Sequence, residues 1–184
     1  EHTVFWACSV ILASVGTQLP FDRLIKAVDT WSQLRNRDDV IAQIGPAEYL
    51  PKTINYFSFM EHDRFFELQS RCSVMVSHAG MGSIITALEL GKPIIILARD
   101  HERNEHRNAH QSDTLRRFAH YPGIYPARDE AHVIELLDQS ETLTAHASIE
   151  ATAPREFTDR LAHYVKYETP PSRRSRLMAM LRGR

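Results

Sequence analysis

The sequence predicts an α/β fold, a Rossmann-like parallel sheet with helices on both faces. Short apolar runs alternate along the chain with stretches of helical period, which is typical of strand–helix–strand units. The apolar runs carry Val and Ile at both alternate positions, as strands do when helices cover both faces of a sheet. The 184 residues, 43% of them hydrophobic and 24% charged, suit a single soluble domain.

Six apolar runs are predicted as buried strands. The longest apolar stretch, Val4–Val15, has about half of the roughly 20 residues that span a bilayer, so it predicts a strand over Val10–Val15 and not a membrane anchor. Turn-forming or polar residues bound the other five runs. These are Val40–Gln43, Ile54–Phe59, Val74–Ser77, Ile94–Leu97 and the short run Gly123–Tyr125.

Stretches of helical period separate these runs. The first predicted helix, Phe21–Leu34, places Leu24, Ile25 and Val28 on one face, as a helix that packs on a sheet requires. Gly91 can take the left-handed conformation that ends a helix. The other predicted helices are Asp63–Arg71, Ser83–Leu90, Asn108–Phe118 and Glu130–Leu137, and a closing helix over Pro154–Tyr167.

The chain is predicted to have three parts. Residues 1–9 are left uninterpreted, residues 10–168 form the folded domain and residues 169–184 form a basic tail. The formal charge of the whole chain is −1, and the tail holds five Arg and no acidic residue from Pro170 onward. The mixture of Arg with large apolar side chains fits either a segment that lies on an anionic membrane surface or a disordered end.

The composition argues against several classes of protein. A charge near zero gives no field that would attract nucleic acid. Cys8 and Cys72 show neither CxxC nor zinc-ligand spacing, so a reducing compartment is expected. No basic segment precedes the first apolar run, so no secretory signal is predicted, and the absent initiator Met suggests a trimmed or incomplete sequence. A cytoplasmic location is therefore expected.

The strongest functional signal is the loop after the predicted strand Val74–Ser77. The segment Ser77–Ser83 runs from a strand directly into a helix through two glycines, Gly80 and Gly82. Glycines let backbone N–H groups approach an anion, and the positive end of a helix stabilises a phosphate. The loop lacks the third glycine of a dinucleotide fingerprint and the Gly-Lys-Ser/Thr of a P-loop. A diphosphate site and a plain tight turn both fit this pattern.

Four motifs occur in a fixed order over about Val10 to Phe118. They are Val15–Ile25, Ser77–Ser83, Ala87–Pro93 and Asn108–Gln111. Together they resemble the C-terminal, sugar-nucleotide-binding domain of the MurG-like glycosyltransferases of family 28, and most of all the small soluble subunits of two-chain bacterial exopolysaccharide transferases. The resemblance implies the C-terminal half of a GT-B fold and an inverting transferase that requires no metal and no cofactor.

The resemblance also implies the residues that bind the donor. A metal-free reaction must stabilise the leaving UDP with protein dipoles and cations, which a glycine-rich helix N-terminus supplies. Gln111 would contact the transferred sugar, with Asn108 and His110 in the same motif, while Gly16 and Thr17 would face the cleft between domains. The diphosphate would be bound by Gly80, Met81, Gly82 and Ser83, with His78 at its border.

Thr86 departs from the family pattern. Many members have a carboxylate at this position, which holds the hydroxyl groups of the ribose. The nearest acid, Glu89, lies three residues on, about 4.5 Å further along a helix axis. The resemblance therefore supplies no carboxylate for the ribose, and Thr86 is the candidate residue at this position.

Cations and histidines gather between the last two motifs. Arg99 and Arg107 are predicted to contact an anion or the sugar, because a diphosphate needs cations. The histidine spacing also suggests a metal site, but the neighbouring arginines would repel a cation and no acidic ligand completes the set. No metal is therefore expected. The histidines considered are His101, His106 and His110.

The resemblance implies a donor-binding subunit that moves a hexose-type sugar from a UDP-sugar to a lipid-linked or polysaccharide acceptor. Because the donor-domain pattern begins near residue 10, no room is expected for an acceptor domain before it. A membrane-anchored partner would bind the acceptor, so the chain is expected to be peripheral at the inner face of the membrane. The general base is expected on that partner, with His78 as the candidate on this chain.

Two other functions fit parts of the sequence. A non-catalytic nucleotide-sugar sensor or scaffold is the main alternative, because Thr86 stands in place of the acid. A sugar-nucleotide epimerase of related architecture would need both domains in one chain, which the length disfavours. The transferred sugar stays open, because one or two side chains decide between glucose, glucuronate, galactose and N-acetylglucosamine.

Overall fold

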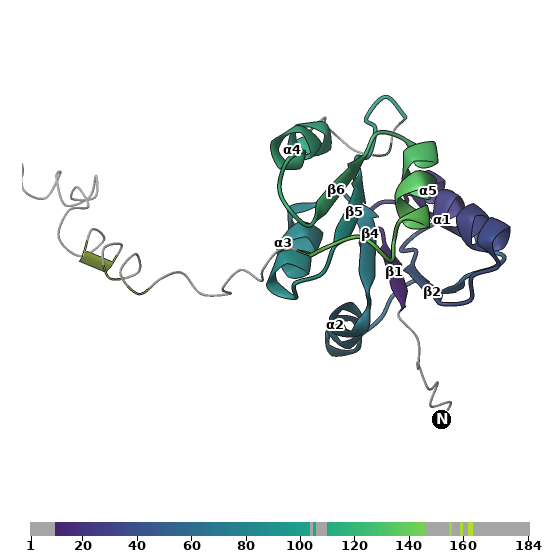
Figure 1. The fold of residues 1–184 in the computed structure, drawn as a ribbon, viewed down its shortest axis with the longest axis horizontal. Helices are drawn as coiled ribbons and strands as arrows, with labels where there is room; N and C mark the ends of the chain where they lie inside the picture. Colours follow the sequence, from purple (N-terminus) through teal and green to yellow (C-terminus); the bar gives the residue numbers. More distant parts are fainter. Residues whose placement is uncertain are drawn as a thin grey trace, which may run out of the picture. The chain divides into compact units, whose positions relative to one another are not determined.

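Six parallel strands form one sheet in the order β3-β2-β1-β4-β5-β6 (Figure 1). The computed structural model describes residues 10–103, Glu105, residues 110–145 and the isolated positions 155, 159, 162 and 163. All neighbouring strands pair in parallel. The strands are β1 (Ile11–Ser14), β2 (Val40–Gln43), β3 (Asn55–Phe57), β4 (Val74–His78), β5 (Ile94–Leu97) and β6 (Ile124–Ala127).

The strand order reverses beside β1. The chain builds β1, β2 and β3 toward one edge of the sheet, and then returns to place β4 on the other side of β1, with Ser14 opposite Ser77. The connections that leave the carboxyl ends of β1 and β4 therefore lead to opposite faces. Open α/β sheets bind ligands in the crevice that such a reversal creates.

Helices cover both faces of the sheet. The described residues place α1 (Asp22–Arg35) and α5 (Glu130–Asp138) on one face, where the two helices contact each other. The other face carries α2 (His62–Arg71), α3 (Met81–Glu89) and α4 (His110–Phe118) (Figure 1). The sheet is thus the middle layer of three.

Alternate residues of each strand enter two separate cores. In β1, Ile11 and Ala13 pack in the core beneath α1 and α5, whereas Leu12 packs in the core beneath the other three helices. Buried Val and Ile at both alternate positions therefore follow from a sheet that is covered twice. The predicted fold class and the predicted double coverage are confirmed.

The prediction of a buried strand over Ile54–Phe59 is wrong. The strand β3 is three residues long and forms the edge of the sheet beside β2. Tyr56, in its middle, is 43% exposed. Aromatic residues favour strands of either kind, so the apolar run indicated a strand correctly but did not indicate how deeply it is buried.

Two glycines show where local backbone geometry sets element boundaries. Gly91 has φ +59° and follows α3, which confirms the predicted helix end. Gly123 has φ +82°, so it lies in a turn and β6 begins only at Ile124, one residue later than predicted. The helix α3 begins at Met81, two residues before the predicted start.

Trp31 and Cys72 are both buried. The Nε1 of Trp31 donates a hydrogen bond to the Asp138 carboxylate at 2.8 Å and so ties α1 to α5. Burial raises the pKa of the Cys72 thiol to about 11, which disfavours the reactive thiolate.

Several predictions concern parts of the chain outside the described residues. These parts are residues 1–9, most of the predicted closing helix and the basic tail. Contacts divide the chain into two units, residues 1–149 and residues 150–184, and the sheet with its helices belongs to the first. Among the helices of the described residues, none has the length and apolar character needed to cross a membrane.

Asp29 on α1 anchors the connection between β2 and β3. Its carboxylate is 3% exposed and accepts four hydrogen bonds, from Tyr49 Oη at 2.6 Å and from the N–H groups of Lys52, Thr53 and Ile54 at 2.9, 2.9 and 3.1 Å. Burial is the largest single influence and raises the pKa of this carboxyl, but the hydrogen bonds together bring it below its ordinary value. The same contact raises the pKa of Tyr49 to about 12.

Asp29→Asn is expected to destabilise the fold by about 2–4 kcal/mol near neutral pH, because the amide cannot accept all four bonds and leaves buried donors unpaired. The native carboxylate stabilises the fold above the unfolded pKa, and this contribution is lost as the pH falls through the lowered pKa of the folded state. In urea unfolding, the difference between the two proteins should therefore narrow below about pH 4.

Asp63→Asn is the control, because the Asp63 carboxylate lies fully in solvent. Its effect should stay within about 0.5 kcal/mol. A difference between wild type and Asp29→Asn that is the same at every pH would contradict the assignment.

Candidate functional site

A cavity of about 230 Å³ opens where the chain leaves β1, β4 and β5. Five residues predicted from the sequence line it, although they lie in four separate segments of the chain. These are Gly16, Thr17, His78, Arg99 and Gln111. Val15, Gln18 and Leu19 of the β1–α1 loop also contribute to the lining. The cavity therefore lies at the crevice created by the reversal of strand order.

The His78 imidazole lies against two glycines. A Cβ atom at Gly16 would lie 3.3 Å from His78 Cε1, and one at Gly80 would lie only 2.4 Å from His78 Nε2. Gly16 also has φ +78°, which side chains rarely adopt, whereas the φ of Gly80 is an ordinary −93°. A side chain at Gly80 would therefore force the His78 ring to shift, whereas at Gly16 the backbone conformation itself favours glycine.

Gln43 and Gly45 hold the β1–α1 loop, and sequence reasoning missed both. The buried Gln43 amide accepts a hydrogen bond from Gly16 N at 3.1 Å and donates to Gly16 O at 3.0 Å. At Gly45, φ is +58° and a Cβ atom would lie 2.4 Å from Gly16 O. A polar residue in an otherwise apolar strand, followed two positions later by a glycine, is the signal that could have found them.

The start of α3 has the features of an anion site. Gly80 precedes the helix in an extended conformation. Because glycine has no side chain, it cannot cap the N–H groups of the first turn. The first turn, from Met81, contains no acidic residue. Apart from its chain neighbours and the helix backbone, no heavy atom of the described residues lies within 4 Å of a Cβ atom placed at Gly82, so these residues leave the approach to that turn open. The unpaired N–H groups of a first turn and the helix dipole favour a negative charge there.

Hydrogen bonds between serine side chains connect this turn to the sheet. Ser77 Oγ donates to Ser14 O at 3.0 Å and lies 3.0 Å from Ser83 Oγ. Ser77 is fully buried and Ser83 is half-buried. The hydrogen bonds fix the orientation of Ser83 relative to the adjacent strands β1 and β4.

The Arg99 guanidinium, which is predicted to contact an anion or the sugar, is bonded to protein carbonyls in the structure. Arg99 is 4% exposed, and its terminal nitrogens are occupied by protein carbonyls. They donate to Val15 O, Leu19 O, Pro20 O and Glu105 O at 2.6, 2.8, 2.8 and 3.3 Å. Burial lowers the pKa of Arg99, although the nearby Glu105 carboxylate counteracts this. The residue therefore organises the cavity wall.

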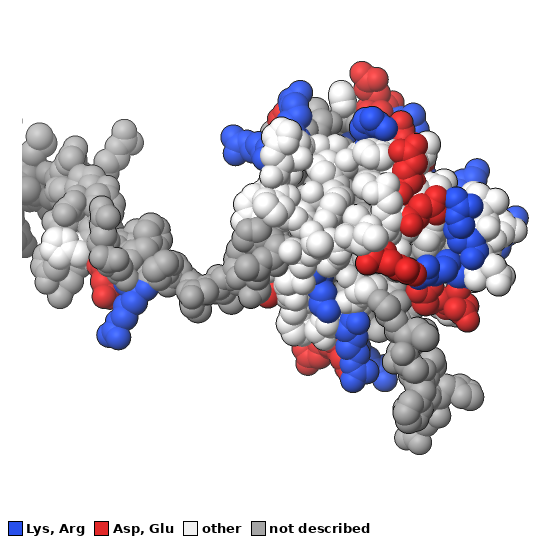
Figure 2. Space-filling view, in the orientation of Figure 1, with Lys and Arg blue, Asp and Glu red and all other residues white. Residues whose placement is uncertain are grey.

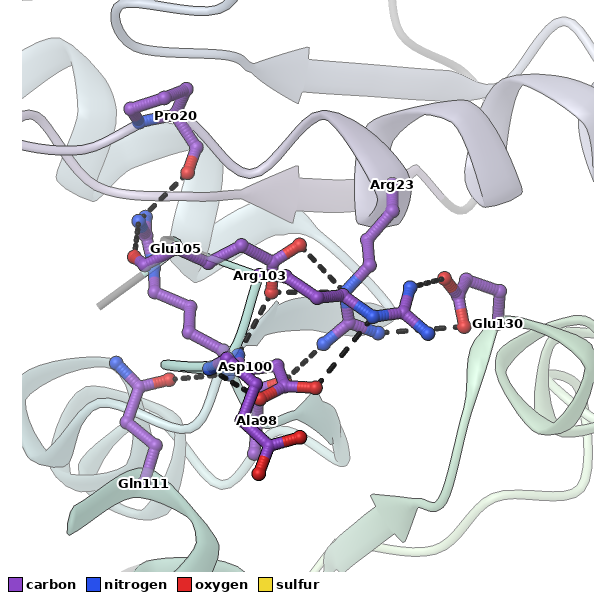
Figure 3. A network of polar contacts seen from close by, with 10 residues as sticks. Pro20, Arg23, Ala98, Asp100, Arg103, Glu105, Gln111 and Glu130 are labelled. Atoms are coloured by element: carbon purple, nitrogen blue, oxygen red, sulfur yellow. Dashed lines mark hydrogen bonds and ion pairs between the residues drawn. The ribbon is translucent and has the colours of Figure 1, made fainter. Parts of the chain in front are cut away.

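Gln111 lies at the start of α4 with its side chain in the cavity wall. The amide Oε1 accepts a hydrogen bond from Arg99 N at 3.0 Å (Figure 3). Because the oxygen is held by the backbone, the NH₂ group of the same amide is the part that remains for a ligand. The buried position, 7% exposed, gives this donor a fixed direction.

The remaining predicted site residues either lie outside the described residues or do not line this cavity. Arg107 and Asn108 fall outside the described residues. His110 begins α4, and its side chain also lies outside the description. Thr86 is half-buried on α3 and is not among the described residues that line the 230 Å³ cavity.

A second cavity, of about 730 Å³, borders the start of α3 from the side of α4. Met81 lines it together with Thr114, Phe118 and charged residues of α4. The charged residues are Asp113, Arg116 and Arg117, of which Asp113 and Arg116 form an ion pair. Basic side chains are visible over α4 in Figure 2. The loop predicted from the sequence thus faces open space on two sides.

Metal ligands do not gather in the described part of the chain. Its His, Cys, Asp and Glu residues form no group of three or more that could hold an ion. His106 lies outside this part, so the expectation of a metal-independent site stays a prediction.

An open parallel sheet with a cavity at its strand reversal, next to a glycine-rich helix start, defines a Rossmann-like domain of the ligand-binding kind. The glycosyltransferase family 28 C-terminal domain matches residues 10–160, and the chain belongs to this family. The resemblance drawn from four motifs is therefore confirmed.

A human relative matches part of the chain. UDP-N-acetylglucosamine transferase subunit ALG13 of Homo sapiens is 29% identical over 107 residues. The match covers 53% of this chain and 9% of the human protein. The chain thus spans less than a tenth of the length of that relative.

Solved structures share the fold. The NMR structure of ALG13 has a TM-score of 0.54 at 17% identity and covers 83% of this chain and 94% of its own. The calicheamicin glycosyltransferase CalG4 has a TM-score of 0.59 at 14% identity, over 89% of this chain and 45% of its own. The UDP-GlcNAc 2-epimerase of Methanocaldococcus jannaschii has a TM-score of 0.57 at 10% identity, over 86% and 45%. The domain corresponds to the C-terminal half of a GT-B fold.

Gly80→Ala is expected to destabilise the protein by about 1–3 kcal/mol, because the added Cβ atom would force the His78 ring to shift. Gly82→Ala is the matched control. Its Cβ atom would meet no described residue within 4 Å beyond its own chain neighbours and helix backbone, and the position is helical, so stability should stay the same or rise by up to about 1 kcal/mol. Urea unfolding measures both, and equal destabilisation by the two variants would contradict the close contact at His78.

Proposed function

We propose that the chain is the donor-binding subunit of an inverting, metal-independent glycosyltransferase. It moves a hexose-type sugar from a UDP-sugar to a lipid-linked or polysaccharide acceptor. The observation that carries the proposal is the meeting of an open helix start, at Gly80 to Ser83, with a cavity lined by His78 and Gln111. Membership of glycosyltransferase family 28 supports the reaction class.

The start of α3 is suited to the diphosphate of the donor. Its first turn presents the N–H groups of Met81, Gly82 and Ser83 without an acidic neighbour in the turn. During transfer, negative charge develops on the leaving UDP, and fixed donors at a helix N-terminus stabilise that charge without reorganising. No metal is needed for this role.

Gln111 is suited to the transferred sugar. Its amide oxygen is held by Arg99 N, so the NH₂ group can donate to a sugar hydroxyl. Gly16 and Thr17, from the β1–α1 loop, line the same cavity. In this arrangement Asn108 and His110 extend the sugar site, and Thr86 offers the ribose a hydroxyl in place of the carboxylate common in the family.

A membrane-anchored partner chain supplies the acceptor site in this proposal. The human relative is named a transferase subunit, which supports a role in an assembly. On this chain, the His78 ring is packed against Gly16 and Gly80, so we assign it to the cavity wall and place the general base on the partner. The chain then acts in the cytoplasm at the inner face of the membrane, where the basic tail after Pro170 favours anionic lipids.

Gly82→Val is expected to weaken UDP binding by about tenfold or more, because a branched side chain would block the approach of the diphosphate to the backbone. The open space at Gly82 leaves room for the side chain, so the variant should fold. Calorimetric titration with UDP measures the effect. Ile85→Val, one turn further on an exposed face of α3, is the control and should bind UDP as the wild type does.

Two results would count against the proposal at different points. Unchanged UDP affinity in Gly82→Val would mean that the diphosphate lies elsewhere. Absence of UDP binding by the wild type, tested both alone and with its partner, would overturn donor binding altogether.

A nucleotide-sugar sensor or scaffold is the second candidate, because Thr86 replaces the acid common in the family. The transferase transfers the sugar of the UDP-sugar, whereas the sensor or scaffold only binds it. The chain purified with a membrane-anchored partner should transfer sugar from a UDP-sugar to a lipid-linked acceptor, while either protein alone transfers little. A complex that binds the UDP-sugar tightly and transfers nothing would favour the scaffold.

A further inference from the structure

Two arginines join the β1–α1 loop to the segment that leads from β5 toward α4. Arg99 reaches back to the loop and donates to its carbonyls at Val15, Leu19 and Pro20. Arg23, in the first turn of α1, reaches forward to Ala98 O and to the Glu105 carboxylate (Figure 3). We call Arg23, Arg99 and Glu105 the arginine bridge.

Arg99 acts on both walls of the cavity at once. Its side chain occupies carbonyls of the β1–α1 loop, while its backbone N–H holds the amide of Gln111 at 3.0 Å. Within the described residues, the N–H groups of Thr17, Gln18 and Leu19 donate to no protein acceptor, and these residues line the cavity. Arg99 therefore connects the two parts of the cavity lining that carry these unpaired backbone groups and the Gln111 amide.

Glu105 is the node of the bridge. Its two carboxylate oxygens lie 2.8 and 3.0 Å from Arg23 Nε, and one of them accepts from Asp100 N at 2.9 Å. Its own carbonyl accepts from Arg99. The side chains of Arg23 and Glu105 are only 16% and 15% exposed, so water screens this ion pair less than it screens a surface pair.

We propose that Arg99 and Glu105 are positioning residues that fix Gln111 relative to the β1–α1 loop and thereby set how strongly the site prefers a UDP-sugar over UDP. The inference rests on the proposed donor site. Within the described part of the chain, no hydrogen bond joins the diphosphate turn at Gly80 to Ser83 to the bridge, so loosening the bridge should affect the sugar contact more than the diphosphate contact.

Arg103 provides the matched control. It lies in the same connection after β5 and pairs with Asp100 and with Glu130 (Figure 3). Glu130 also pairs with Arg23 at 3.4 Å, but the Arg103 side chain itself bonds neither Arg99 nor Glu105 among the described contacts. The Arg103 side chain is 59% exposed. Removing its charge therefore changes the electrostatics of the same segment without breaking the bridge.

Glu105→Gln is the test variant, because removing Arg99 itself would leave several carbonyls unpaired and could prevent folding. Hydrogen–deuterium exchange without any ligand should show faster exchange in peptides covering residues 15–21 and 110–118, by about threefold or more, in Glu105→Gln but not in Arg103→Gln. Calorimetry with UDP, UDP-glucose and UDP-N-acetylglucosamine measures the preference for the sugar.

Glu105→Gln should lower the ratio of UDP-sugar affinity to UDP affinity by about fivefold, with UDP affinity itself within about twofold of wild type. Gln111→Glu, which keeps an oxygen for Arg99 N but removes the NH₂ donor, should lower the same ratio. Arg103→Gln should leave it unchanged. The variants are compared under conditions in which each is fully folded. A purely structural role would lower the affinities for UDP and for the UDP-sugar by the same factor.

The outcomes separate the positioning role from the proposed function. Exchange rates and affinity ratios that are the same in Glu105→Gln and Arg103→Gln would overturn the positioning role. If the wild type binds none of the three ligands, the proposed function fails, and the ligand-free exchange still decides whether Glu105 holds the two walls together.

Discussion

The reversal of strand order beside β1 is the constraint on which the site depends. Because β4 returns to pair with β1, the loops after these two strands start side by side and then lead to helices on opposite faces. The crevice between them cannot be filled by either helix, so it stays open to a ligand. His78, at the end of β4, lies against Gly16 after β1 because the parallel register brings Ser14 beside Ser77.

Backbone geometry, more than charged side chains, shapes the described part of the cavity. The glycines at positions 16, 45 and 80 allow three chain segments to approach so closely that a Cβ atom at each would contact a neighbour. Arg99, which the sequence suggests as an anion contact, instead donates hydrogen bonds to carbonyls of the β1–α1 loop. A buried guanidinium that bonds several carbonyls fixes a loop firmly, because losing any bond would leave a buried polar group unpaired.

The electrostatics of the site suit a charged leaving group. The helix α3 starts in an open position with no acid in its first turn, and its N-terminus lies next to the cavity that holds Gln111. Elsewhere on the surface acidic and basic side chains are paired, as where Arg35 of α1 meets Asp138 of α5 (Figure 2). Positive potential from helix dipoles falls off within the first turn, so it acts on a ligand only where the backbone can be approached.

The sequence by itself determined the fold class, the strand and helix order and most of the residues around the cavity. Apolar runs at both alternate positions indicate a sheet that is covered twice, and the two glycines after Val74–Ser77 indicate a tight turn or an anion site. Sequence did not reveal that β3 is an edge strand, that Gln43 holds Gly16, or that Arg99 faces carbonyls. Those features depend on which strands become neighbours and which loops meet above them, and contacts between residues 27 to 84 positions apart exist only once the chain has folded.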